Sequence, residues 1–176
     1  SKPGEGKSTV SGNLAFVLAQ GGKKVIIVDA DLRKPTIHKK FRVANTAGLT
    51  DCLIGKKKVN EVVNKIEDNV HIITAGQKTP NPAEMVSSKA MEDLIAALKD
   101  VYDYVIIDCP PSLGLITLNS LTAASGVIIP VQTEYYALEG LSQLMNTFNI
   151  VKKHLNSKLD IFGVLLTMTD SRTNIS

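Results

Sequence analysis

The chain of 176 residues has only two cysteines, Cys52 and Cys109, which lie far apart in the sequence. They form neither a CxxC pair nor a cysteine–histidine spacing, which argues against both a zinc site and a disulfide framework. The three histidines are equally scattered and make no metal-ligand pattern. Because free thiols are typical of a reducing compartment, we expect a cytoplasmic protein.

Long apolar runs and a strong excess of charge are also missing. No run of apolar residues approaches the length that spans a bilayer, and no secretory signal peptide is visible. The net charge of +3 is too small to indicate nucleic-acid binding by itself. The chain is 44% hydrophobic and 21% charged, which is the composition of a globular domain with one buried core.

Short β-branched runs alternate with longer helical patterns along the chain. Strands are predicted at residues 24–28, 70–74, 104–107, 126–131 and 161–167, and helices at residues 8–20, 85–100 and 137–155. The first of these strands, KVIIV, is apolar almost throughout, as expected for a strand that is buried on both faces. Strands separated by helices predict one α/β domain, with a mostly parallel sheet and helices on both faces.

The first residues, SKPGEGKST, contain a glycine-rich lysine loop. They satisfy the pattern G-x-x-x-x-G-K-[ST] from its sixth position onward, with Ser1 in place of the first glycine. Inward-turned backbone amides, a helix N-terminus and the Lys7 ammonium together make a cradle for polyphosphate. The residues predicted to bind the nucleotide are Gly4, Glu5, Gly6, Lys7, Ser8 and Thr9. The alternative is a glycine-rich turn that merely precedes a helix.

Three aspartates follow apolar strands. Asp29 and Asp31 lie in VIIVDADLR, and Asp108 lies in YDYVIIDCPP. In an open α/β sheet the carboxyl ends of the strands meet at the ligand site, so we expect these aspartates near the cradle. A phosphate cradle combined with an aspartate on a separate strand is the arrangement that holds ATP with Mg²⁺. Taken alone, each aspartate is equally compatible with a helix cap or a turn.

The combination of PGEGKS, IVDAD and IIDCPP resembles the deviant-Walker P-loop ATPases. This superfamily includes the ParA and MinD positioning ATPases, nitrogenase iron proteins and bacterial tyrosine kinases. Residues 1 to about 108 resemble the tyrosine kinases of polysaccharide export, through DADLRKP and PNPAEMVSS. Residues from about 104 to 176 resemble ParA-type partition ATPases, through DCPPSLGLITLNSL and the stretch that follows. The resemblance therefore implies a chimera with a seam near residues 104–114.

The resemblance also implies that the domain spanning residues 1–176 is partial. Members of the superfamily have a strand before the P-loop, in the middle of the sheet, and this first strand is absent here. ParA proteins also continue beyond the position of Ser176, with segments that help enclose the base. Loss of a central strand exposes two rows of backbone groups, so we expect either a fragment or a sheet of marginal stability.

The resemblance assigns roles to the site residues. Lys7 would contact the β- and γ-phosphates, while Ser8, Asp31 and Asp108 would form the metal site, Asp108 through a water. Asp29 would activate the acceptor hydroxyl in a kinase, or position a water for hydrolysis in a ParA protein.

Lys2 occupies the place of the signature lysine that ParA and MinD proteins send across a dimer interface. Its neighbour is Pro3 where those proteins have glycine, and proline fixes φ and removes an N–H. Two roles remain open for Lys2. It could be a catalytic lysine that acts in trans across a homodimer interface, or an incidental surface charge.

Three functions are therefore expected. The first is a Mg²⁺-dependent ATPase of the ParA/MinD type that binds ATP and ADP and dimerises with nucleotide. Non-specific DNA would be its partner in chromosome partition. The second is a bacterial protein-tyrosine kinase domain. The third is a catalytically silent nucleotide-binding fragment.

Overall fold

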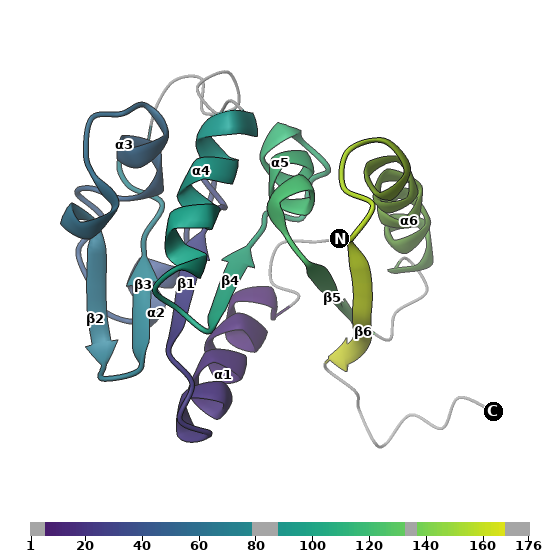
Figure 1. Cartoon of the computed structure of the whole chain (residues 1–176). Coiled ribbons are helices and arrows are strands. Elements are labelled where there is room, and N and C mark those ends of the chain that lie inside the picture. Colours follow the sequence, from purple (N-terminus) through teal and green to yellow (C-terminus); the bar gives the residue numbers. More distant parts are fainter. Residues whose placement is uncertain (1–5, 79–87, 133–136, 168–176) are drawn as a thin grey trace.

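The computed structural model describes residues 6–78, 88–132 and 137–167. Helices and strands alternate along most of the chain, as Figure 1 shows. The elements are α1 (Lys7–Gln20), β1 (Val25–Asp29), α2 (Ile37–Lys40), α3 (Leu49–Leu53), the 3-10 helix η1 (Val59–Glu61), β2 (Val63–Glu67), β3 (Val70–Ile73), α4 (Ser88–Lys99), β4 (Tyr104–Asp108), α5 (Leu115–Ala123), β5 (Gly126–Gln132), α6 (Ala137–His154) and β6 (Asp160–Thr167).

The strands form two sheets. The first has four strands in the order β2-β3-β1-β4, and the second consists of β5 and β6. β1 pairs in parallel with both β3 and β4, β5 pairs in parallel with β6, and β2 is antiparallel to β3. The predicted α/β class with a mostly parallel sheet is confirmed. Within the described residues no strand joins β4 to β5, so the sheet is interrupted at this point.

β1 is apolar from Val25 to Val28 and ends in Asp29. All five of its residues are buried. Ile26 and Val28 pack in one cluster with Met91 and other residues of α4, whereas Val25 and Ile27 pack in another cluster with Ala15 of α1. Alternate side chains point to opposite faces of a strand, so each face of β1 is covered by a different helix.

A third, smaller core lies under the second sheet. Leu121, Phe148, Val151 and Leu159 form this cluster, which joins α5 and α6 to the start of β6. Asn156, in the turn after α6, donates from Nδ2 to the backbone oxygens of Leu121 and Ala124.

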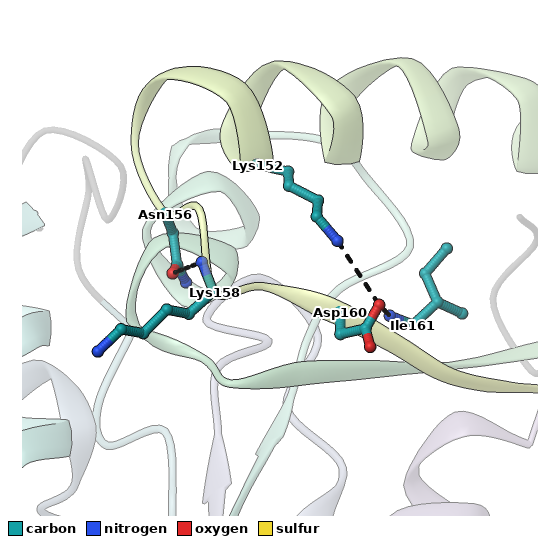
Figure 2. A network of polar contacts seen from close by, with 5 residues as sticks. All are labelled: Lys152, Asn156, Lys158, Asp160 and Ile161. Carbon is teal, nitrogen blue, oxygen red and sulfur yellow. Dashed lines mark hydrogen bonds and ion pairs between the residues drawn. The ribbon is translucent and has the colours of Figure 1, made fainter.

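The turn between α6 and β6 is held by further polar contacts (Figure 2). The Asn156 Oδ1 atom accepts the backbone N–H of Lys158, and Lys152 forms an exposed ion pair of 3.6 Å with Asp160. An exposed pair of this kind contributes at most about 1 kcal/mol, so the turn depends mainly on Asn156 and the cluster beneath it.

The predicted strands and the helices 8–20 and 137–155 are confirmed with small shifts at their ends. The predicted helix 85–100 is described from Ser88 onward, and residues 79–87 lie outside the described residues. Sequence reasoning missed β2, α5 and the short helices α2, α3 and η1. Among the described residues, no helix has the length and apolar character that a membrane span requires.

Candidate functional site

The beginning of α1 lies against the carboxyl end of β4. Ser8 Oγ donates a hydrogen bond of 2.5 Å to Asp108 Oδ2, and Ser11 Oγ donates one of 3.1 Å to Asp108 Oδ1. Both oxygens of the buried Asp108 carboxylate thus accept from side chains of α1. The register of the sheet places Asp29 directly beside Asp108. The structure therefore brings the predicted cradle helix and two of the three predicted aspartates together.

The N-terminus of α1 is suited to an anion. Its cap residue, Gly6, has a φ of 76° and supplies no side-chain hydrogen bond to the first turn, which contains no acidic residue. A side chain at this φ would be strained, although the space around a Cβ there is open. The first N–H groups of a helix lack intrahelical partners and carry partial positive charge, so this end attracts phosphate.

Asp29 is fully buried at the end of β1. Its Oδ2 accepts the backbone N–H of Ile37 at 3.1 Å, and its Oδ1 accepts that of Asp31 at 3.2 Å. Burial raises the pKa of Asp29 to about 7, and the charges of Asp108 and Asp31 act in the same direction, against the two backbone hydrogen bonds. Asp29 is thus oriented by the backbone and is close to its own titration point at neutral pH.

Burial and polar contacts also act in opposite directions on the pKa of Asp108. Burial raises its pKa, whereas the hydrogen bonds from Ser8 and Ser11 and the positive charge of Lys7 lower it. The charge of Asp31 raises it further. Lys7 and Asp31 therefore both lie within electrostatic reach of Asp108, as the sequence predicts.

Asp31 is used partly by its own turn. Its Oδ1 accepts the backbone N–H groups of Arg33 and Lys34 at 3.3 and 2.9 Å. Asp31 thus has the turn role that the sequence allows for each of the three aspartates. No direct contact between Asp31 and Ser8 is described, so a place for Asp31 in a metal shell stays a prediction.

Two contacts from the segment after Asp31 were not foreseen. Thr36 Oγ1 lies 2.8 Å from Ser8 Oγ, and Lys40 Nζ donates to Thr9 Oγ1 at 2.7 Å. This segment therefore lies beside the first turn of α1. The residues are about 30 positions apart in the sequence, and no local pattern marks them. Only the fold reveals this pairing.

Lys2, Gly4 and Glu5 lie outside the described residues. Their predicted parts in catalysis and nucleotide binding stay predictions.

The residues present fit a magnesium ion bound together with a nucleotide. Ser8 Oγ and the Asp108 carboxylate are adjacent hard oxygen donors. Within residues 6–78, 88–132 and 137–167, no group of three or more His, Cys, Asp or Glu side chains is arranged to hold a metal. Mg²⁺ is usually held by one or two protein groups plus phosphates and water, so a site that the nucleotide completes is consistent with this arrangement.

The pKa of Asp29 predicts how stability depends on pH. Its folded-state pKa of about 7 lies above the ordinary value of 3.8, so the folded state binds this proton more tightly than the unfolded state. The stabilisation from this proton is present below about pH 4 and is lost as pH rises through 7, a change on the order of 4 kcal/mol. We expect Asp29→Asn to flatten the fall in the free energy of unfolding between pH 4.5 and 7.5, measured by chemical denaturation.

The exposed Asp68→Asn variant is the control for this measurement, and it should keep the pH slope of the unaltered chain. Equal slopes for Asp29→Asn and the unaltered chain would contradict the assignment.

Comparison with known proteins identifies the family. The AAA domain model AAA_31 matches residues 1–161. The sporulation initiation inhibitor protein Soj of Bacillus subtilis is 46% identical over 182 residues, which cover 99% of this chain and 72% of that protein. The tyrosine-protein kinase YwqD of Bacillus subtilis is 44% identical over 133 residues, covering 74% of this chain and 56% of the kinase.

Solved structures agree with this placement. Cobyrinic acid a,c-diamide synthase from Mycobacterium smegmatis, solved with a bound ATP analog and magnesium, has a TM-score of 0.89 at 30% identity and covers 98% of this chain and 73% of its own. The septum site-determining protein MinD from Pyrococcus horikoshii, complexed with Mg-ADP, has a TM-score of 0.78 at 27% identity, with coverage of 94% and 66%.

The Soj match runs along nearly the whole chain, on both sides of the predicted seam at residues 104–114, while the kinase match covers a smaller part. The seam itself stays a prediction. The fold, the position of Asp108 against α1 and the family match lead to one conclusion: the chain belongs to the P-loop ATPase superfamily of the ParA and MinD type.

Proposed function

We propose that this protein is a Mg²⁺-dependent ATPase whose nucleotide state controls its dimerisation, as part of a partition or positioning system. The observation that carries the proposal is the contact between Ser8 and Asp108, which joins the N-terminus of α1 to the strand beside Asp29. A phosphate-binding helix end, a metal-ligand pair and a buried carboxylate then occupy one edge of the sheet. This is the set of groups that phosphoryl transfer requires.

Binding would rest on the first turn of α1. Its backbone N–H groups and the Lys7 ammonium would hold the phosphates, and Thr9 would donate to the α-phosphate. When bound, Mg²⁺ supplies positive charge against the phosphate oxygens. Ser8 and Asp108 would hold it, Asp108 through a water. The relatives solved with an ATP analog and magnesium, or with Mg-ADP, support this choice of ligand.

Asp29 would then act on the attacking group. Two backbone N–H groups fix its carboxylate, and its pKa of about 7 suits a group that holds a water and accepts its proton near neutral pH. Both of its oxygens are already oriented, so little reorganisation is needed at the moment of reaction.

A tyrosine kinase is the second candidate, because a tyrosine-protein kinase matches 74% of the chain at 44% identity. Here Asp29 would take its proton from a tyrosine hydroxyl instead of water. The chemistry at the γ-phosphate is the same, and the group that reaches it decides the outcome. A nucleotide-binding fragment without turnover is the third candidate.

Replacement of Lys7 tests nucleotide binding. Lys7→Ala removes the side-chain cation of the cradle, and we expect ATP affinity to fall by at least about a hundredfold in a calorimetric titration with Mg²⁺. Lys23→Ala, an exposed lysine just beyond the opposite end of α1, is the matched control and should bind as the unaltered chain does. Unchanged affinity in Lys7→Ala would refute the site.

Asp29→Asn tests the chemical step. The variant should bind ATP normally and lose turnover by at least about a hundredfold, because the amide cannot accept the proton. Phosphate release with and without DNA measures hydrolysis, and transfer of labelled γ-phosphate to tyrosine measures kinase activity. The exposed Asp100→Asn variant is the control. Full turnover in Asp29→Asn would remove this residue from the mechanism, and bound nucleotide without either activity in the unaltered chain would favour the silent fragment.

Dimerisation is tested at Lys2. If this lysine reaches a partner's phosphates, ATP should double the mass measured by light scattering, and Lys2→Ala should abolish the increase while ATP binding persists. The same mass with and without ATP in the unaltered chain would argue against a nucleotide-dependent dimer.

A further inference from the structure

Thr36 lies immediately before α2, but its side chain does not cap that helix. Threonine is a favoured N-cap residue because its hydroxyl can accept an N–H of the first turn. Here the exposed Thr36 makes no side-chain cap hydrogen bond. Its Oγ1 atom lies 2.8 Å from Ser8 Oγ, at the start of α1. The Thr36 hydroxyl is therefore used at the candidate site and not by its own helix.

The contacts of Ser8 show which of the two hydroxyls donates. A serine hydroxyl has one proton and two lone pairs. Ser8 donates its proton to Asp108 Oδ2, so the proton between Ser8 and Thr36 comes from Thr36. Ser8 Oγ thus accepts through one lone pair and keeps the other. Because Cβ, the proton and the first lone pair have fixed directions, the second lone pair of this oxygen has only one direction left.

The segment that carries Thr36 is held against α1 by packing. The side chain of Ile37 is fully buried and belongs to the same cluster as Ala15 of α1. The Phe41 ring lies over Gly12, where an added Cβ would be 3.4 Å from the ring atom Cζ. These apolar contacts flank Thr36 and do not involve its hydroxyl. The backbone of Thr36 is therefore placed without the hydrogen bond to Ser8.

The same segment also holds Asp29. The backbone N–H of Ile37 donates to Asp29 Oδ2 at 3.1 Å, and Thr36 is the residue directly before Ile37. One peptide unit therefore joins the contact with the Ser8 hydroxyl to the contact with the Asp29 carboxylate. Ser8 and Asp29, which come from different elements, are held by adjacent residues of one packed segment.

We propose that Thr36 is a positioning residue whose hydroxyl orients Ser8 Oγ as a ligand for Mg²⁺. The inference rests on the proposed function, because it requires a nucleotide complex that contains Mg²⁺. Residues that orient a metal ligand through a hydrogen bond raise the affinity for the metal, and their loss typically lowers it by about ten- to a hundredfold. Thr36 acts through Ser8, so its loss affects binding of the metal and not binding of the nucleotide alone.

The experiment measures how strongly Mg²⁺ tightens the binding of ADP, a probe that is not turned over. ADP is titrated calorimetrically into the full chain, in EDTA and at a series of Mg²⁺ concentrations. Thr36→Ala should bind ADP in EDTA as the unaltered chain does, but it should need about tenfold more Mg²⁺ for half of the tightening. Thr36→Ser keeps the hydroxyl and should restore the ordinary requirement. The exposed Thr46→Ala variant is the matched control and should show no change.

The outcomes separate this inference from the proposed function. Equal Mg²⁺ requirements in Thr36→Ala and the unaltered chain would overturn the role of Thr36 and leave the metal site standing. A requirement that Thr36→Ser does not restore would also overturn it, because the hydroxyl would not be the cause. If Mg²⁺ did not tighten ADP binding in the unaltered chain, the metal site of the proposed function would be refuted together with this inference.

A purely structural role for Thr36 is tested without metal or nucleotide. Amide exchange at Ile37 reports whether the segment stays docked on α1. We expect Thr36→Ala to exchange at this amide as the unaltered chain does, because packing holds the segment. Exchange faster by about tenfold or more, or weaker ADP binding in EDTA, would show that Thr36 serves only to dock the segment, and would overturn the proposal.

Discussion

The site depends on one interaction, the pair of hydrogen bonds that Ser8 and Ser11 donate to the Asp108 carboxylate. A buried carboxylate is costly unless donors surround it, and here the donors come from a helix about 100 residues earlier in the chain. The bonds fix the start of α1 over the carboxyl end of β4. They also set the distance between the helix N-terminus, which attracts anions, and the aspartates. Without them, α1 would still pack on the sheet through Ala15, and its first turn would keep the contacts of Thr36 and Lys40 but lose its direct bonds to the end of β4.

The negative charges gathered at this edge favour a nearby cation. Burial raises the pKa of both Asp29 and Asp108, and each is raised further by the charges of neighbouring aspartates. Lys7 already lowers the pKa of Asp108. Any further positive charge brought here would stabilise the ionised carboxylates in the same way. By linkage, a carboxylate whose ionised form is stabilised by a cation also binds that cation more tightly. A metal ion bound to a triphosphate is therefore a suitable ligand for this edge of the sheet.

The sequence predicts the buried parts of this fold well, because burial leaves a strong pattern. KVIIV reads as a strand because residues 25–28 are buried on both faces, and YVII reads as one because its sequence is apolar although it is only partly buried. The ends of the two strands place Asp29 and Asp108 at one edge. β2 was missed because VNKIE is half exposed and carries two charges, so its pairing with β3 comes from the fold. α5, LITLNSLTA, has no clear polar face and its hydroxyls bond back to its own turns. The contacts of Thr36 and Lys40 with α1 join distant residues, and nothing local indicates them.

The gap in the sheet and the candidate site are connected through β4. Within the part of the chain that the structure describes, this strand carries Asp108 at its end and has one edge without a ladder partner. A strand paired on one side only exchanges and frays more readily than one paired on both, so the precision with which Asp108 is held is limited by that edge. Ser8 and Ser11 hold the carboxylate from the side of α1, and among the described residues the backbone beneath it pairs with β1.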